Sequence, residues 1–127
     1  MNIKCGTDII EISRIKKSIE DLGEKFLNKI YTKDEVEYCE SKKDQKYQHY
    51  AARFAAKEAT FKALSEKLNG KYDLSWKDYE IKNNREGKPI LTINKSNKIT
   101  EEIESIDVSL SHCKEYATAN VIVLFKW

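Results

Sequence analysis

The sequence predicts an α+β fold in a single domain, with helices packed on one face of a mainly antiparallel β-sheet. Three observations support this prediction. Apolar residues recur at helical spacing before Gly70, whereas after it short runs of alternating apolar and polar residues are bounded by turn residues. The 127 residues suffice for one buried core and are too few for two. No repeat, linker or change of composition divides residues 1–127, so we expect one domain over that range.

The first predicted elements are a strand and a helix. Residues 3–12 form a buried strand, because isoleucines dominate its second half. Asp8 lies within this strand, where a carboxylate is costly unless it is paired, hydrogen-bonded or bound to a metal. Ser13 is the expected N-cap of the helix that follows, and Gly23 is its expected end.

The next helix is predicted from its start signal. Thr32 and Glu35 have the spacing of a capping box, which predicts a helix over residues 33–41. The polar run 42–46 is then a turn. A long helix should follow over residues 48–68, because no glycine, proline or asparagine interrupts it before Asn69.

Two faces of the long helix differ in character. One face carries small side chains that let the helix backbone lie close to a neighbouring element, namely Ala52, Ala55, Ala56, Ala59 and Ala63. On another face Glu58 lies between two phenylalanines, with Lys62 one turn further on and Lys57 on the flank. This arrangement fits a ligand for a hard metal beside a phosphate-bearing substrate, but it also fits a surface Glu–Lys pair that supports the helix.

The second half of the chain has the signals of β-structure. Two short strands should form a hairpin, a short helix should connect it to the last two strands, and those strands should pair across a break at 114–115. In order, the predicted elements are a strand at 79–83, a strand at 90–93, a helix at 96–104, a strand at 107–111 and a strand at 116–125.

Composition excludes several classes of protein. The 40% hydrophobic and 35% charged content is typical of a folded domain, and a net charge of +2 without an aromatic-basic stripe argues against a nucleic-acid partner. Three widely spaced cysteines indicate neither a disulfide framework nor a zinc site. No signal peptide and no stretch of about 20 apolar residues is visible, so we expect a cytoplasmic location and no membrane partner.

Three segments together resemble one protein family. The run Phe54-x-x-Lys57-Glu58-Ala-x-x-Lys62 resembles the second signature of the 4′-phosphopantetheinyl transferases, and Gly6-Thr7-Asp8 matches their first signature. The opening (6–15) and the tail (109–119) are similar to those of the small bacterial members of this family. The three segments occur in the family's order and span nearly the whole chain, so the sequence is identified as a member.

The resemblance implies an activity and a metal. Members transfer the 4′-phosphopantetheine group from coenzyme A to a serine of an apo acyl carrier protein, which yields the holo carrier and adenosine 3′,5′-bisphosphate. By resemblance, Asp8 and Glu58 bind Mg²⁺, and Glu58 and Lys62 are catalytic, because charge develops on pyrophosphate oxygens in such a transfer. The group that removes the serine proton is left open between a water on the metal, Glu58 and Lys62.

The resemblance also implies contacts with coenzyme A. Lys62 should reach the pyrophosphate and Lys57 a nucleotide phosphate. Arg53 lies one turn further back on the helix and is a weaker phosphate candidate, although its guanidinium can form two parallel hydrogen bonds. His112 falls where many relatives carry a histidine near the substrate, although a histidine satisfied within a strand is the alternative.

Two further expectations concern partners. A basic cluster of Arg14, Lys16 and Lys17 matches the family's helix for docking the acidic carrier protein, although acidic residues follow it where many relatives are basic. The family forms homotrimers with active sites between subunits, so Asp8 and Glu58 could combine with another chain, and Val121 and Val123 could supply the contact or belong to the core. The alternative function is a non-catalytic module that recruits an acidic carrier-like protein.

Overall fold

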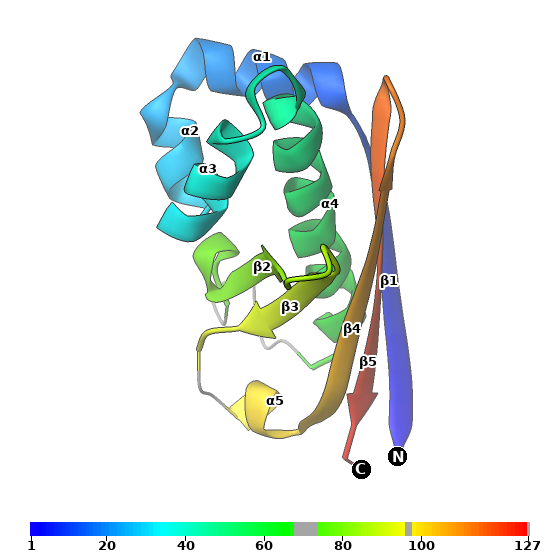
Figure 1. Ribbon diagram of the computed structural model, residues 1–127. Coiled ribbons are helices and arrows are strands. Elements are labelled where there is room, and N and C mark those ends of the chain that lie inside the picture. Colours follow the sequence, from blue (N-terminus) through cyan, green and yellow to red (C-terminus); the bar gives the residue numbers. More distant parts are fainter. Residues whose placement is uncertain (68–73, 96–97, 127) are drawn as a thin grey trace.

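The structure is a computed structural model that describes residues 1–67, 74–95 and 98–126. Its central element is a long helix, α4 (Lys46–Leu64), which packs on one face of a three-stranded antiparallel sheet (Figure 1). The sheet has the order β1-β5-β4, so the first and last strands of the chain are neighbours. Its strands are β1 (Asn2–Glu11), β4 (Ile103–His112) and β5 (Tyr116–Phe125).

The remaining elements lie mostly on the other side of α4 (Figure 1). Three helices gather near the beginning of α4, and a two-stranded antiparallel sheet lies beside α4 and β4. These elements are α1 (Ile12–Leu22), α2 (Glu24–Ile30), α3 (Lys33–Glu40), β2 (Tyr79–Asn83), β3 (Pro89–Ile93) and the short α5 (Lys98–Glu101), with 3₁₀ turns at Lys43–Gln45 and Trp76–Asp78. The α+β architecture predicted from the sequence is therefore confirmed.

Several predicted elements are confirmed, and others need correction. The capping box of Thr32 and Glu35 is present with both of its hydrogen bonds, and Gly23 ends α1 with a positive φ of 57°. Ser13 is not the N-cap, because α1 already begins at Ile12. The prediction missed α2 and began α4 two residues late. It also extended α4 too far, because the helix ends at Leu64 and residues 65–67 form a turn; Asn69 itself lies outside the described residues.

The small face of α4 explains how closely helix and sheet approach. Ala55, Ala59 and Ala63 are buried against the sheet, as the sequence predicts. The closest approach is at Gly6 of β1, where an added Cβ would lie 2.0 Å from the carbonyl oxygen of Ala59. Only glycine fits there, so the backbone of β1 lies directly on α4.

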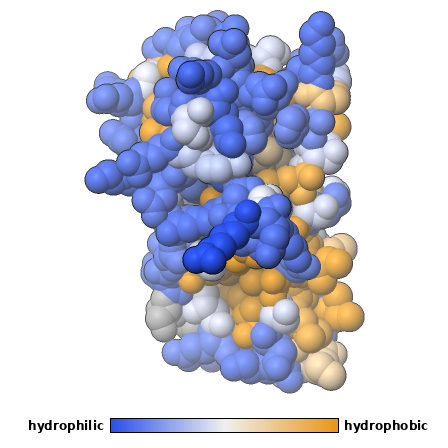
Figure 2. Space-filling view, in the orientation of Figure 1, coloured by the Kyte–Doolittle hydropathy of each residue, from blue (hydrophilic) through white to orange (hydrophobic). Residues whose placement is uncertain are grey.

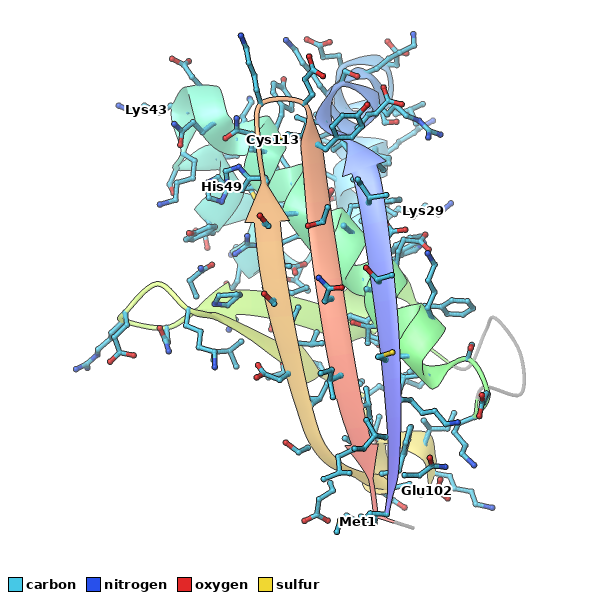
Figure 3. All side chains as sticks on the ribbon, turned by 90° about the vertical axis from the view of Figure 1, so that its right-hand side faces the viewer. Met1, Lys29, Lys43, His49, Glu102 and Cys113 are labelled. Carbon is cyan, nitrogen blue, oxygen red and sulfur yellow. The ribbon has the colours of Figure 1, made fainter. Side chains whose placement is uncertain are left out.

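No helix of the described part of the chain covers the opposite face of the three-stranded sheet (Figure 3). Val121 and Val123 are fully buried against α4, so of the two alternatives they belong to the core and not to a contact between subunits; alternate residues of β5 point to opposite sides. Apolar side chains of β1 and β5 occupy the outer face instead, and part of this apolar surface is visible at the lower right of Figure 2. They are Ile3, Ile9, Tyr116 and Ile122, exposed by 67%, 63%, 43% and 56%.

Within the described ranges, no helix is both long and apolar enough to cross a bilayer.

Candidate active site

Asp8, Glu58 and Lys62 meet where β1 crosses α4. Lys62 Nζ donates hydrogen bonds to Asp8 Oδ1 at 3.2 Å and to the Thr7 carbonyl at 3.0 Å. Burial raises the pKa of Glu58, the negative charge of Asp8 raises it further, and the ammonium of Lys62 opposes both effects. One chain therefore brings together both carboxylates that the family signatures single out.

Local structure explains this meeting. Gly6 and Asp8 are two residues apart on a strand, so both face α4. Glu58 and Lys62 are four residues apart on a helix, so they lie one above the other on the same side. The contact of Gly6 with Ala59 brings the two elements close enough for the side chains on either side to interact.

The oxygen atoms at this crossing suit a hard divalent cation. Glu58 and Asp8 supply two carboxylates whose charges repel each other, and the ammonium of Lys62, paired with Asp8, offsets part of this repulsion. Within residues 1–67, 74–95 and 98–126, no group of three or more His, Cys, Asp or Glu side chains is arranged so that it could hold a metal ion by itself. Mg²⁺ often takes one or two carboxylates, with its remaining ligands from water and substrate phosphate, so this donor set fits it.

A cavity of about 530 Å³ opens beside Glu58. Its walls come from α4, from the segment 74–79 and from Lys29 of α2, and they are mostly apolar. The hydroxyl of Tyr79 is buried there and has no hydrogen-bond partner in the described part of the chain, and burial raises its pKa. The lining residues are Lys29, Lys57, Glu58, Phe61, Leu74, Ser75, Trp76 and Tyr79.

Lys57 does not have the position that its predicted contact with a nucleotide phosphate requires. Its side chain is fully buried, and its ammonium donates to Glu35 Oε1 at 2.7 Å and to two backbone carbonyls. Burial lowers the pKa of Lys57, and the carboxylate of Glu35 opposes this shift. The structure therefore argues against a phosphate contact and for a role inside the protein.

Arg53 and His112 belong to a second cluster, near the beginning of α4. The Arg53 guanidinium lies 4.4 Å from the centre of the Tyr38 ring, and its Nη2 donates to Asn83 Oδ1 at 2.7 Å. Arg53 is only 2% exposed, and its Nε has no hydrogen-bond partner among the described residues. The His112 ring lies 5.9 Å from that of His49, which is labelled beside β4 in Figure 3.

The sequence interpretation missed His49. Burial, the positive charge of Arg53 and the nearby His112 lower the pKa of His49 to about 4. The only local signal was its position four residues before Arg53, which places both on one side of α4. The contact with His112 depends on the folded chain, because 63 positions of sequence separate the two histidines.

The predicted docking residues lie on α1, and all three are exposed. Lys17 pairs with Asp21 at 3.2 Å, and Lys16 lies 5.5 Å from the centre of the Tyr47 ring. Part of the positive charge on α1 is therefore offset by its own acidic residues, as the sequence suggests.

Comparison with known proteins assigns this chain to a family. The family model of the 4′-phosphopantetheinyl transferase superfamily matches residues 4–121. This chain belongs to that superfamily. Curated relatives are holo-[acyl-carrier-protein] synthases: one from Ruminiclostridium cellulolyticum is 47% identical over 97% of this chain and 92% of the relative, and one from Chlamydia muridarum is 48% identical over 92% and 90%.

Solved structures of superfamily members share the fold. A holo-(acyl-carrier-protein) synthase from Bacillus anthracis, in complex with CoA (3′,5′-ADP), superposes with a TM-score of 0.78 at 35% identity and covers 94% of both chains. The enzyme from Helicobacter pylori, in complex with coenzyme A, gives a TM-score of 0.81 at 33% identity over 94% of this chain and 99% of that chain. The phosphopantetheinyl transferase fold therefore extends over nearly the whole of this chain.

Proposed function

We propose that this protein is a holo-[acyl-carrier-protein] synthase that transfers the 4′-phosphopantetheine group from coenzyme A to a serine of an apo acyl carrier protein. One observation carries the proposal within the structure. Asp8, Glu58 and Lys62, the residues of the two family signatures with chemistry suited to a pyrophosphate, come together at one crossing of strand and helix. Curated relatives with this name cover nearly the whole chain, which supports the same reaction.

In this proposal Asp8 and Glu58 hold Mg²⁺ beside the pyrophosphate of coenzyme A. Bound there, the cation would withdraw negative charge from the pyrophosphate oxygens. Lys62 is 52% exposed at its side chain, so its ammonium is accessible to the pyrophosphate and can offset the charge of the leaving adenosine 3′,5′-bisphosphate. Glu58 and Lys62 are the proposed catalytic residues.

The cavity beside Glu58 is the proposed place of the phosphopantetheine arm. The arm is long, with apolar stretches separated by two amides, and the walls of the cavity are mostly apolar around a few polar groups. Arg53 and His112 lie in the other cluster of α4, so we assign them to the nucleotide end of coenzyme A rather than to the pyrophosphate.

The exposed basic residues of α1 are the proposed docking surface for the acidic carrier protein, through charge complementarity. The apolar outer face of the sheet is the proposed contact between subunits of a homotrimer, because four large apolar side chains are exposed together on β1 and β5. We expect the reaction to take place in the cytoplasm.

The direct test follows the mass of the carrier protein. The protein is incubated with apo acyl carrier protein, coenzyme A and Mg²⁺, and the carrier is analysed by mass spectrometry. We expect the carrier to gain one 4′-phosphopantetheine group, and to gain none when coenzyme A is left out or EDTA is added. An unchanged carrier mass across several carriers and divalent metals contradicts the proposal, and binding of the carrier that ignores coenzyme A favours a non-catalytic module.

A further inference from the structure

The residue before Glu58 on α4 takes part in a buried ion pair. Lys57 Nζ and Glu35 Oε1 are 2.7 Å apart, and both side chains are fully inaccessible to solvent. Lys57 precedes Glu58 on α4, but successive helical residues point about 100° apart. The side chains of these two neighbours therefore lie in different surroundings: that of Lys57 points into the protein, whereas that of Glu58 approaches Asp8.

The hydrogen bonds of this pair are complete. A lysine ammonium has three N–H groups, and Lys57 directs them to the carbonyls of Ile30 at 2.8 Å and Trp76 at 3.0 Å and to Glu35 at 2.7 Å. Glu35 also accepts hydrogen bonds from the backbone N–H groups of Thr32 and Ile81, both at 2.9 Å. No N–H group of Lys57 is left for a substrate phosphate.

These contacts join the two walls of the cavity. Lys57 belongs to α4, which carries Glu58, whereas Trp76 belongs to the opposite wall. The ring of Trp76 also stacks on Phe54 of α4, with ring centres 5.0 Å apart. Through Ile81, the same pair fixes the start of β2, next to Tyr79 of the cavity wall.

We infer that Lys57 and Glu35 are positioning residues, which hold the wall of Trp76 and Tyr79 opposite Glu58 so that the cavity accepts the arm of coenzyme A. The inference rests on the proposed function and adds a positioning role for Glu35 and for the ammonium of Lys57, whose hydrogen bonds all go to other groups of the protein. A buried pair suits this task, because removing one partner leaves an unpaired charge that the surroundings must move to accommodate. Displacements of about 1 Å in such walls change binding and turnover strongly.

The test compares two ligands that differ by the arm. Coenzyme A carries the phosphopantetheine arm, whereas adenosine 3′,5′-bisphosphate lacks it, and both dissociation constants are measured by calorimetry with Lys57→Met. We expect affinity for coenzyme A to fall about tenfold or more and its KM in the transfer reaction to rise in parallel, while affinity for adenosine 3′,5′-bisphosphate changes less than about twofold. Lys82→Met is the matched control, because it removes an exposed ion pair (2.9 Å to Asp34) between β2 and α3.

Other outcomes overturn the inference. An equal loss for both ligands, with a weaker dependence on salt, makes Lys57 a phosphate ligand, and unchanged affinity for both makes the pair purely structural. If Lys57→Met does not fold, the double variant Glu35→Gln/Lys57→Met removes both charges, and the same comparison is made with it. If the unchanged protein neither binds coenzyme A nor modifies a carrier, the proposed function itself fails.

Discussion

Asp8 and Glu58 repel each other, and the fold nevertheless places them together at the end of a tight helix–strand contact. The ammonium of Lys62 offsets part of this repulsion through its hydrogen bond to Asp8. Such an arrangement of charges stabilises the protein little, but it supplies two oxygen ligands and one cation at a single point. At the scale of residues, these groups are the ones that the proposed binding of Mg²⁺ and a pyrophosphate requires.

Removing either carboxylate should abolish transfer without unfolding the protein. For Asp8→Asn and Glu58→Gln we expect the rate of carrier modification to fall about 100-fold or more, because each change removes a ligand that helps neutralise the pyrophosphate. The free energy of unfolding in urea should stay the same or rise slightly, since the repulsion is relieved. Glu66→Gln, at an exposed ion pair just beyond α4, is the control that keeps full activity. Either variant retaining most of its activity at low Mg²⁺ would contradict the metal assignment.

His49 should make stability depend on pH. Its pKa is about 4 in the folded chain and near 6.5 when unperturbed, so between these values the unfolded chain takes up a proton that the folded chain does not. Burial comes first among the causes, and Arg53, His112 and Lys42 add positive charge around the ring. The free energy of unfolding should therefore fall as the pH is lowered from 7 to 5, and fall less in His49→Gln. Urea titrations at both pH values test this, and equal losses would refute it.

At the scale of elements, the contact between α4 and β1 decides the geometry of the site. Buried alanines of α4, Ala59 above all, and Gly6 of β1 let the two backbones approach each other directly. Larger side chains on either element would separate helix and strand and would move Glu58 away from Asp8. The glycine of the first family signature therefore acts through packing, whereas the aspartate two positions later is the proposed metal ligand.

Gly6→Ala tests this contact. The new Cβ would lie 2.0 Å from the Ala59 carbonyl oxygen, so helix and strand must shift apart. We expect the free energy of unfolding to fall by about 3 kcal/mol, at the upper end for overpacked sites, and transfer activity to fall as well. Ala59→Gly should not restore either property, because the clash involves the backbone. Cys5→Ala, on the exposed face of the same strand, should leave the stability unchanged within about 0.5 kcal/mol.

At the scale of the whole molecule, the described elements cover the three-stranded sheet on one side and leave its other side open. The core lies between this sheet and α4, and the other side exposes isoleucines and a tyrosine of β1 and β5 (Figure 3). Large apolar side chains exposed on one face of a sheet favour an interaction site there. In the proposed homotrimer it would be buried between subunits.

Charge on this face should prevent assembly. We expect the protein to sediment as a trimer, and Ile9→Asp or Ile122→Lys to shift it toward the monomer, because burying an unpaired charge in an apolar contact is costly. Ile90→Lys changes an isoleucine that is 41% exposed on β3, away from this face, and should not alter the mass measured by sedimentation velocity. A monomeric unchanged protein would rule out the trimer.

Features that depend on residues close together in the chain could be predicted from the sequence. The capping box of α3, the end of α1 at Gly23, the hairpin and the last strand all follow from local spacing and turn chemistry, and the structure contains them. Family motifs added the likeness to phosphopantetheinyl transferases, which the comparisons confirm. The helix α2 escaped prediction because its seven residues are too few to show a helical period.

The contacts between charged side chains could not be predicted in this way, because they depend on how distant segments pack in the folded protein. Glu58 and Lys57 are consecutive in one motif, yet one approaches Asp8 while the other is buried with Glu35. The partners of Lys57 come from residues 30, 35 and 76, which local patterns do not connect to α4. A helical sequence determines the angle between two side chains, but the elements packed around the helix determine what each of them meets.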